Sequence, residues 1–291
     1  MTLLTIDIGG QGIKHAIWKD DKIQDKNTFE TPSDWETLKK KMKSVVDQAK
    51  LQHDIRGIAM SCPGSVDSQA GIIKGVSAVQ YLHGLKIVEA WEELFGLPVS
   101  IENDANAAAL AELGYGVAKS YQNVAFMIIG TGIGGAIVMN GDLVKGRHLF
   151  GGELGYMLLD QQNTLSNLAS SRSQISRHNK ANPTDLIQNG LELFALAQNG
   201  HQAAITIVEE IYDALAQGLY NISLMIDPEL LAIGGGISVR PDIVKQLSKR
   251  LTYLLEKNGA GDIKPNIQVC HFFNDANLIG AAVHFERTLR Q

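Results

Sequence analysis

The feature that most constrains the fold is a weak internal repeat. Residues 124–144 align with residues 3–23 without a gap, and each segment reads as a strand, a glycine-rich turn, a second strand, a polar turn and the start of a third strand. A later strand at 230–233 runs into three glycines and resembles the strand at 55–61, which is followed by Pro-Gly. Two such pairs in the same order favour duplication over chance, and they predict two similar α/β lobes with a cleft between them.

The length of 291 residues also exceeds what one core usually supports. We assign residues 1–112, together with a C-terminal helix at 277–291, to the first lobe and residues 113–276 to the second. In the first lobe, Ser33–Glu36 matches a capping box with Ser33 as the N-cap residue, followed by apolar residues at helical spacing.

Composition excludes several classes of protein. The net charge of −5 argues against a general nucleic-acid binder, which needs clustered Lys and Arg to displace counterions from phosphates. We expect no membrane span and no signal peptide, because long apolar runs and a charged leader pattern are missing. The two cysteines, Cys62 and Cys270, sit in apolar runs without metal-binding spacing, so we expect a cytoplasmic location.

Two glycine-rich turns follow strands and suit phosphate binding. Asp7-Ile-Gly-Gly10 places a carboxylate at a strand end, where it would hold Mg²⁺ beside glycine amides; a hairpin turn with an Asp cap is the alternative. Gly130–Gly135 holds four glycines in six residues, without the Lys of a Walker A loop. The following segment leads into Asn140-Gly141, a hairpin signal, whereas a dinucleotide fingerprint would open a helix. The pattern indicates a phosphate cradle made of backbone amides.

Two acidic segments are candidates for substrate chemistry. Asn103 and Asp104 join a strand to a helix rich in small residues, and the alternative is that one of them serves only as its N-cap. A sugar kinase needs a carboxylate within reach of the attacking hydroxyl and neighbouring polar groups to fix the sugar ring. Glu153 lies between glycines in an apolar stretch, where it either binds two sugar hydroxyls or is a surface loop residue.

Together these segments resemble the ROK family (repressors, open reading frames and kinases), whose kinases phosphorylate hexoses with ATP. The resemblance covers nearly the whole chain and adds Pro63–Asp67, Gly151–Gly155 and Gly234–Gly236 to the motifs above. It implies an actin-like ATPase (ribonuclease H-like) fold and a homodimer that binds sugar, ATP and Mg²⁺.

The resemblance also implies roles for individual residues. Asp104 would be the general base and Asp7 the Mg²⁺ ligand. The substrate-binding residues would be Gly64, Ser65, His83, Asn103, Asp104 and Glu153. The nucleotide-binding residues would be Gly9, Gly10, Gln11, Gly12, Lys14, Gly130, Thr131, Gly132, Gly134, Gly234, Gly235 and Gly236, the last three near the adenosine.

The chain departs from the family pattern in three places. Gln11 replaces the usual Thr, and Tyr156 replaces a His that contacts sugar and zinc. The segment 161–170 lacks the cysteines of the zinc loop, and Ser166 or Asn167 replaces a sugar-binding Glu. We therefore expect no structural zinc and a substrate with different or larger groups at that edge of the ring.

The sequence leaves three functions to compare: a sugar kinase, a sugar-responsive regulator and a catalytically inactive sugar-binding protein. The first is an ATP-dependent kinase acting at C6 of glucose or of a β-glucoside. Residues 77–84 resemble the same segment of zinc-free family members that act on β-glucosides. Within this segment, His83 either contacts sugar or packs within its loop. An N-acetylmannosamine kinase is the alternative substrate class. A sugar-responsive regulator is disfavoured because only six residues precede Asp7, too few for a DNA-binding helix-turn-helix. A catalytically inactive sugar-binding protein is disfavoured because Asp7 and Asp104 are present.

Overall fold

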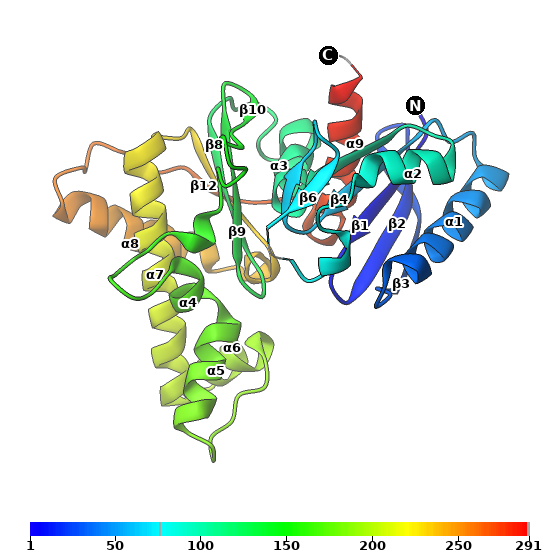
Figure 1. The fold of residues 1–291 in the computed structure, drawn as a ribbon. Coiled ribbons are helices and arrows are strands. Elements are labelled where there is room, and N and C mark those ends of the chain that lie inside the picture. The colour runs from blue at the N-terminus through cyan, green and yellow to red at the C-terminus, as the bar shows by residue number, and fades with distance from the viewer. Residues whose placement is uncertain (76, 290–291) are drawn as a thin grey trace. The chain divides into compact units, whose positions relative to one another are not determined.

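Two five-stranded mixed sheets form the frame of the protein, one in each of two units (Figure 1). The computed structural model describes residues 1–75 and 77–289. Unit 1 comprises Met1–Lys119, Gly146–Phe150 and the C-terminal segment from Asn274, and unit 2 comprises Ser120–Lys145 and Gly151–Phe273. The last two residues of the expected C-terminal helix, 290 and 291, lie outside the described residues.

The sheet of unit 1 has the strand order β3-β2-β1-β4-β7, in which β1, β4 and β7 are parallel and β2 and β3 are antiparallel to their neighbours. A separate hairpin joins β5 to β6. The elements of this unit are β1 (Leu3–Ile8), β2 (Gly12–Lys19), β3 (Lys22–Glu30), α1 (Trp35–Gln52), β4 (Gly57–Cys62), β5 (Ser65–Asp67), β6 (Ile72–Lys74), α2 (Ile87–Phe95), β7 (Val99–Asn103), α3 (Asp104–Tyr115) and α9 (Ala276–Thr288).

The sheet of unit 2 repeats this order as β10-β9-β8-β11-β12, again with three parallel strands beside an antiparallel hairpin. The elements of this unit are β8 (Val124–Ile129), β9 (Ile133–Met139), β10 (Asp142–Leu143), α4 (Leu165–Ala169), α5 (Ser171–Ala181), α6 (Gly190–Gln198), α7 (Gln202–Ile226), β11 (Leu230–Gly234), α8 (Ile243–Lys257) and β12 (Ile267–Val269).

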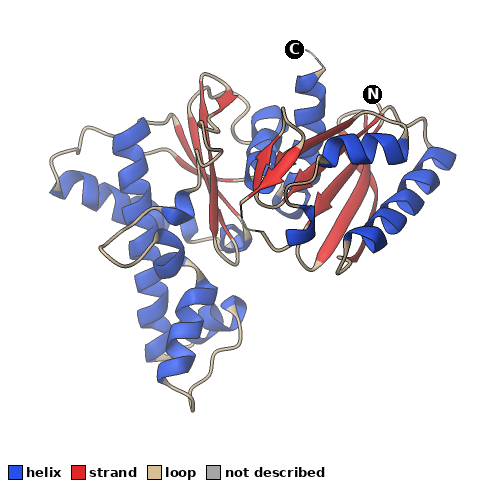
Figure 2. Cartoon of the chain, viewed as in Figure 1, coloured by secondary structure: helices blue, strands red, loops and turns tan. Residues whose placement is uncertain are grey.

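The predicted duplication is confirmed by these two topologies. The strands β1 and β8 begin the two copies, and β4 and β11 pair parallel to them in the same order. Unit 2 differs by an insertion: the helices α4, α5 and α6 precede α7, at the place where unit 1 carries only α1 before its next strand (Figure 2).

In unit 1, alternate residues of the parallel strands face opposite layers. One set packs in the apolar core against α1 and α2, with Leu38 and Trp91 fully buried there. The other set faces α9; a Cβ added to Gly57 of β4 would lie 2.2 Å from Phe285 of that helix. Because a central parallel strand is covered on both faces, its sequence is almost continuously apolar, and the polar residues within it are therefore informative.

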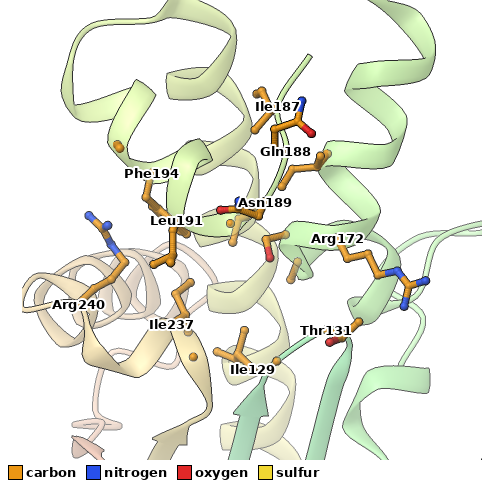
Figure 3. A pocket seen from close by; sticks show the side chains of 18 of the residues that line it. Ile129, Thr131, Arg172, Ile187, Gln188, Asn189, Leu191, Phe194, Ile237 and Arg240 are labelled. Atoms are coloured by element: carbon orange, nitrogen blue, oxygen red, sulfur yellow. The ribbon is translucent and has the colours of Figure 1, made fainter. Parts of the chain in front are cut away.

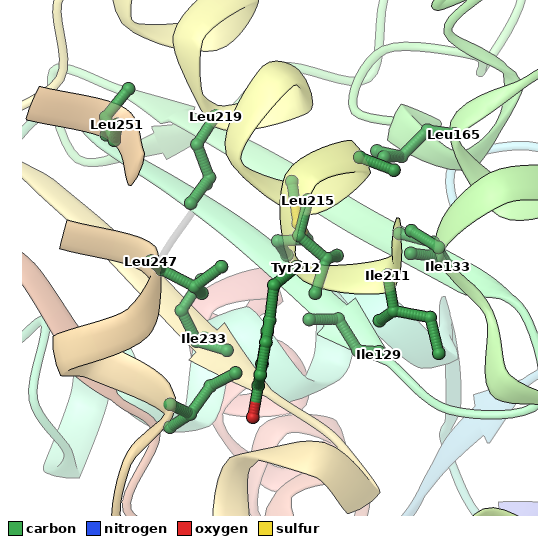
Figure 4. Close-up of a cluster of buried hydrophobic side chains, with 14 of the residues drawn as sticks. Ile129, Ile133, Leu165, Ile211, Tyr212, Leu215, Leu219, Ile233, Leu247 and Leu251 are labelled. Atoms are coloured by element: carbon green, nitrogen blue, oxygen red, sulfur yellow. The ribbon is translucent and has the colours of Figure 1, made fainter. Parts of the chain in front are cut away.

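The core of unit 2 forms where α7 and α8 pack on the sheet (Figure 4). Fully buried leucines recur along both helices at helical spacing, and Tyr212 lies among them at 2% exposure. Its hydroxyl accepts a hydrogen bond from Nε of Arg240 at 3.2 Å, so its polar end is satisfied at the edge of the core.

The predicted N-cap of α1 is wrong by one residue. The helix begins at Trp35, and Asp34 is its N-cap. The carboxylate of Asp34 accepts from the backbone N–H of Thr37 at 2.9 Å and from its hydroxyl at 2.8 Å. Ser33 would have offered one neutral acceptor, whereas Asp34 offers two charged oxygens to the positive end of the helix.

Candidate active site

Three polar side chains occupy one row across the parallel strands of unit 1. The register pairs Asp7 of β1 with Ser61 of β4, and Ser61 with Glu102 of β7. Residues paired in this way point to the same face of a sheet, which here is the face toward α9. All three are buried, with exposures of 7%, 0% and 1%.

Asp7 is held by donors from three elements. Ser61 Oγ donates to Asp7 Oδ1 at 2.9 Å, and Asn277 Nδ2 of α9 donates to the same oxygen at 3.0 Å. The other oxygen, Oδ2, forms an ion pair with Lys14 Nζ of β2 at 3.5 Å. The carboxylate is thus fixed at the end of β1, and its Oδ1 accepts two hydrogen bonds.

The junction between β7 and α3 places Asn103 and Asp104 side by side. Asn103 is the N-cap residue: its Oδ1 accepts from Asn106 N at 3.1 Å. Its Nδ2 donates to Gly64 O at 3.0 Å and to Asp104 Oδ1 at 3.0 Å. Asp104 Oδ1 also accepts from Ala105 N at 2.8 Å. Among the described residues, the hydrogen bonds to Asp104 end on Oδ1, which leaves Oδ2 available to a substrate.

The surroundings of Asp104 favour its protonated form. Removal from bulk water raises the pKa of this carboxyl, and the negative charge of Asp7 raises it further, while the N–H of Ala105 and the amide of Asn103 lower it. Much of the residue surface stays accessible to water, yet the surrounding protein displaces enough water from the carboxyl group to raise its pKa. A carboxylate with a raised pKa is a stronger base than an ordinary Asp.

The pKa of the buried Cys62 thiol also responds to the negative charges gathered around this site. Burial raises its pKa far above the usual range, and the charges of Asp7, Asp104 and Glu102 raise it further. The thiol therefore stays protonated, and the three carboxylates share one edge of the sheet.

The remaining sugar-site predictions in unit 1 fall on the segment after β4. Gly64 has a φ of +96° and presents its carbonyl oxygen to Asn103. Ser65 begins β5. His83 Nε2 lies 2.7 Å from Ser77 Oγ and is partly buried, which matches a packed loop histidine; a sugar contact for it stays a prediction.

The turn formed by Gly9, Gly10 and Gln11 connects β1 to β2, and Gly12 and Lys14 lie in β2. Gly9 N donates to Gly12 O at 3.1 Å, which closes the turn. A Cβ on Gly10 would lie 2.5 Å from Cβ of Ala78, so packing alone already requires glycine at that position.

In unit 2, the glycines of the 130–135 segment divide into two kinds. An added Cβ at Gly130 or Gly132 would meet nothing closer than 3.8 Å, whereas one at Gly135 would lie 2.6 Å from Gly152 O. Gly134 lies within β9, opposite Ile128. Packing explains Gly135, and the open space at Gly130 and Gly132 is what a backbone cradle for a ligand needs.

A cavity of about 900 Å³ opens beside this turn (Figure 3). It is lined by Gly130 and Thr131, by apolar residues of α5 and α6, and by Gly236 at the start of the segment after β11. Its size and largely apolar lining suit a nucleoside. Gly236 has open space at its Cα, whereas Gly234 and Gly235 pack against Ile128 and Ile129 and are not part of the lining.

The same cavity carries two arginines and, among the lining residues that the structure describes, no Asp or Glu. The guanidinium of Arg240 is already engaged by other residues: it lies 4.2 Å from the centre of the Phe194 ring and donates a hydrogen bond to the hydroxyl of Tyr212. Arg172 lies on the side of Thr131, across the cavity from Arg240 (Figure 3). The lining thus combines an apolar chamber with a cationic side next to the glycine turn.

Glu153 lies in unit 2, directly before a short 3₁₀ turn at Leu154–Tyr156. Tyr156 is 65% exposed. Ser166 and Asn167, the two candidates for the position of the family's sugar-binding Glu, are both engaged locally: Ser166 Oγ accepts from Ile133 N at 3.0 Å, and Asn167 completes a capping box with Thr164. Neither residue therefore offers a carboxylate in place of the sugar-binding Glu.

Sequence reasoning did not assign roles to Ser61, Asn277 or Arg172. Ser61 carries a usable signal, a polar residue in an otherwise apolar strand. Asn277 carries none, because its contact with Asp7 spans 270 positions of the chain.

None of the helices in the described chain combines the length and the apolar character needed to cross a membrane. Within residues 1–75 and 77–289, no three His, Cys, Asp or Glu side chains form a cluster that could hold a metal ion.

The ROK family model matches residues 3–288 of the chain. A β-glucoside kinase from Klebsiella pneumoniae is 32% identical over 302 residues, covering 100% of this chain and 98% of the relative. A ROK family protein from Streptococcus pneumoniae, solved in complex with sucrose, has a TM-score of 0.90 at 38% identity, with full coverage of both chains.

A ROK glucokinase from Streptomyces griseus, solved with glucose and AMPPNP, has a TM-score of 0.81 at 23% identity and covers 97% of this chain and 98% of its own. This likeness shows the fold, and the predicted actin-like architecture is confirmed. From the match over nearly its whole length, the chain belongs to the ROK family, among its ATP-dependent sugar kinases.

Proposed function

We propose that the protein transfers the γ-phosphate of ATP to the C6 hydroxyl of glucose or a β-glucoside, with Asp104 as the general base. The observation that carries this proposal is the state of Asp104: its Oδ1 is held by Asn103 and Ala105, its Oδ2 is available, and its pKa is raised. A fixed carboxylate of increased basicity is what abstraction of a hydroxyl proton requires.

In the proposed step, Asp104 Oδ2 accepts the proton as the sugar oxygen bonds to the γ-phosphorus. The bond from that phosphorus to the β,γ-bridging oxygen breaks, and ADP leaves with the electron pair. Asn103 and Gly64 hold the base in place. Asp7 fits Mg²⁺ through Oδ2, which forms an ion pair with Lys14 Nζ at 3.5 Å, and a bound Mg²⁺ would neutralise charge on the donor phosphates.

For the acceptor, a β-glucoside is favoured over N-acetylmannosamine by the edge of unit 2 near Glu153. Tyr156 is an exposed aromatic side chain there, and Ser166 and Asn167 add no acidic ligand. An aromatic face with a polar tip suits contact with a second sugar ring. The β-glucoside kinase named among the relatives supports this choice, and the sucrose complex of the S. pneumoniae protein shows that a related protein binds a disaccharide.

A panel of hexoses, N-acetylhexosamines and β-glucosides tests the proposal. ADP formation is followed by a coupled assay with each sugar and with ATP and Mg²⁺. We expect sugar-dependent ADP release, with β-glucosides or glucose giving the largest kcat/KM. N-acetylmannosamine as the best substrate would overturn the acceptor assignment, and no response to any sugar would overturn the kinase proposal.

The pH dependence of the reaction should reveal the raised pKa of Asp104. The base works only when ionised, so kcat/KM for sugar should fall as the pH decreases through that pKa. Because the pKa is raised, the fall should begin at a higher pH than an ordinary Asp, with its pKa of about 3.9, would give. A rate profile measured between acidic and neutral pH checks this, and an acid limb at or below the ordinary value would contradict it.

Arg172 should contribute to the binding of the nucleotide phosphates. Replacing it with Ala should raise KM for ATP by about tenfold, the effect of losing one charge-assisted hydrogen bond of about 1.4 kcal/mol. Arg177→Ala is the matched control, since Arg177 lies on the same helix but pairs with Glu210 away from the cavity. Equal KM values for ATP in the two variants would remove Arg172 from the nucleotide site.

A further inference from the structure

Glu102 is a buried carboxylate for which the proposed reaction has no use. It is 1% exposed at the end of β7 and lies two positions before Asp104. Burying a charge is costly unless strong partners compensate, and replacing such a group by a well-packed neutral one is often neutral or stabilising. Glu102 is therefore expected to serve a purpose other than stability, and its contacts indicate which.

Its two oxygens contact different elements. Oε1 accepts from the backbone N–H of Asn103 at 2.8 Å and from Asn106 Nδ2 at 3.2 Å. Oε2 lies 3.7 Å from Nδ1 of His284, on α9. The carboxylate is thus bonded to the first turn of α3 on one side and lies against a second helix on the other.

The turn that Glu102 holds is the one that carries the base. Asn103 and Asn106 stand at the two ends of this turn, and Asp104 lies between them. Asn103 in turn donates to Oδ1 of Asp104. A shift at Asn103 or Asn106 would therefore be passed directly to the base, and a small displacement of a reacting group lowers the rate strongly.

We propose that Glu102 is a positioning residue for Asp104: by accepting from both ends of the first turn of α3, it fixes the direction in which Asp104 Oδ2 points. The inference rests on the proposed function in one respect, that Asp104 is the base. On the other side of the carboxylate, Nδ1 of His284 lies 3.7 Å from Oε2 of Glu102 and brings α9 against it.

A second buried glutamate, on α3 itself, provides a matched control. Glu112 is also 1% exposed, but it accepts from Val117 N at 2.9 Å at the far end of α3. Its loss should destabilise that end of the helix without moving Asp104. The pair therefore separates an effect on the base from the general cost of altering a buried carboxylate.

The experiment compares Glu102→Met, Glu102→Gln and Glu112→Met in steady-state assays with ATP and the best sugar of the panel. Met keeps the length of the side chain but removes both acceptors, so E102M should lose about tenfold or more in kcat, with both KM values within about twofold of the wild type. Gln keeps the Oε1 acceptor, so E102Q should retain kcat within about threefold. E112M should keep the wild-type kcat despite a lower melting temperature.

Wild-type kcat in E102M would overturn the proposal, and so would an equal loss of kcat in E112M. If E102M does not fold, Asn106→Ala removes one of the two donors; a loss of kcat in N106A supports the proposal, and an unchanged kcat overturns it. Failure of the proposed function is distinguishable, because the wild-type protein would then show no sugar-dependent turnover at all.

Discussion

Replacing Asp104 with Asn should reduce kcat by about 10²–10⁴-fold, the range by which a general base accelerates a reaction. The amide keeps an oxygen that accepts from Asn103 and Ala105, as Oδ1 does now, so the start of α3 should be preserved. It cannot take the hydroxyl proton. Calorimetric titration with the best sugar should therefore give a Kd close to that of the wild type, while the coupled assay shows the loss of turnover.

Asp54→Asn serves as the control for D104N, because Asp54 is an exposed acid of unit 1 that pairs with the neighbouring Arg56. It should leave both kcat and the sugar Kd unchanged. Retention of most activity by D104N would mean that another group acts as the base. Loss of sugar binding together with turnover would mean that Asp104 shapes the site and does not act chemically.

Replacing Gly280 with Ala should be strongly destabilising. Gly280 lies in α9 where this helix crosses α3, and an added Cβ would lie 1.6 Å from the carbonyl oxygen of Ala107. The obstacle is backbone, so the two helices must separate. Overpacking costs about 1–3 kcal/mol or more, and the gain in helix propensity of about 1 kcal/mol offsets only part of it. We expect a lower melting temperature in calorimetry and, because Ala107 follows Asp104 by one turn, a lower kcat.

Gly114→Ala tests the same crossing from the other helix. Its added Cβ would meet the side chain of Val283, whose nearest methyl group would lie at 3.1 Å and can shift by a few tenths of an ångström. The melting temperature of G114A should equal or exceed that of the wild type, because alanine favours the helix. If G280A and G114A melt alike, the crossing of α3 and α9 is not as tight as the structure indicates.

The architecture was predictable because its strands and turns give signals within short segments of the sequence. Strands, glycine turns and hairpins recur at the same spacing in both copies, so the alignment of 124–144 with 3–23 yields two sheets of the same order. The N-cap of α1 was misplaced because Ser33 and Asp34 are neighbours and both residue types favour the N-cap position. The structure places Asp34 there, with its carboxylate accepting from both the backbone N–H and the hydroxyl of Thr37.

The site was predictable only in part, for a related reason. Asp7, Asn103 and Asp104 stand at strand ends next to glycine or a helix start, which is a local signal. The groups that surround them come from remote parts of the chain: Asn277 and His284 reach the site because α9 packs on β1, β4 and β7. No periodicity in a single sequence encodes such contacts, and the tight approach at Gly280 is equally hidden.

The most direct test of the central claim is to follow the γ-phosphate itself by phosphorus NMR. The wild-type protein is incubated with ATP, Mg²⁺ and the best sugar of the panel, with a sample lacking sugar beside it. We predict that the γ-phosphate signal is replaced by ADP and by one phosphomonoester coupled to the C6 protons of the sugar, only when sugar is present. Release of inorganic phosphate without a sugar phosphate, or no change in either sample, would contradict the assignment of the protein as a sugar kinase.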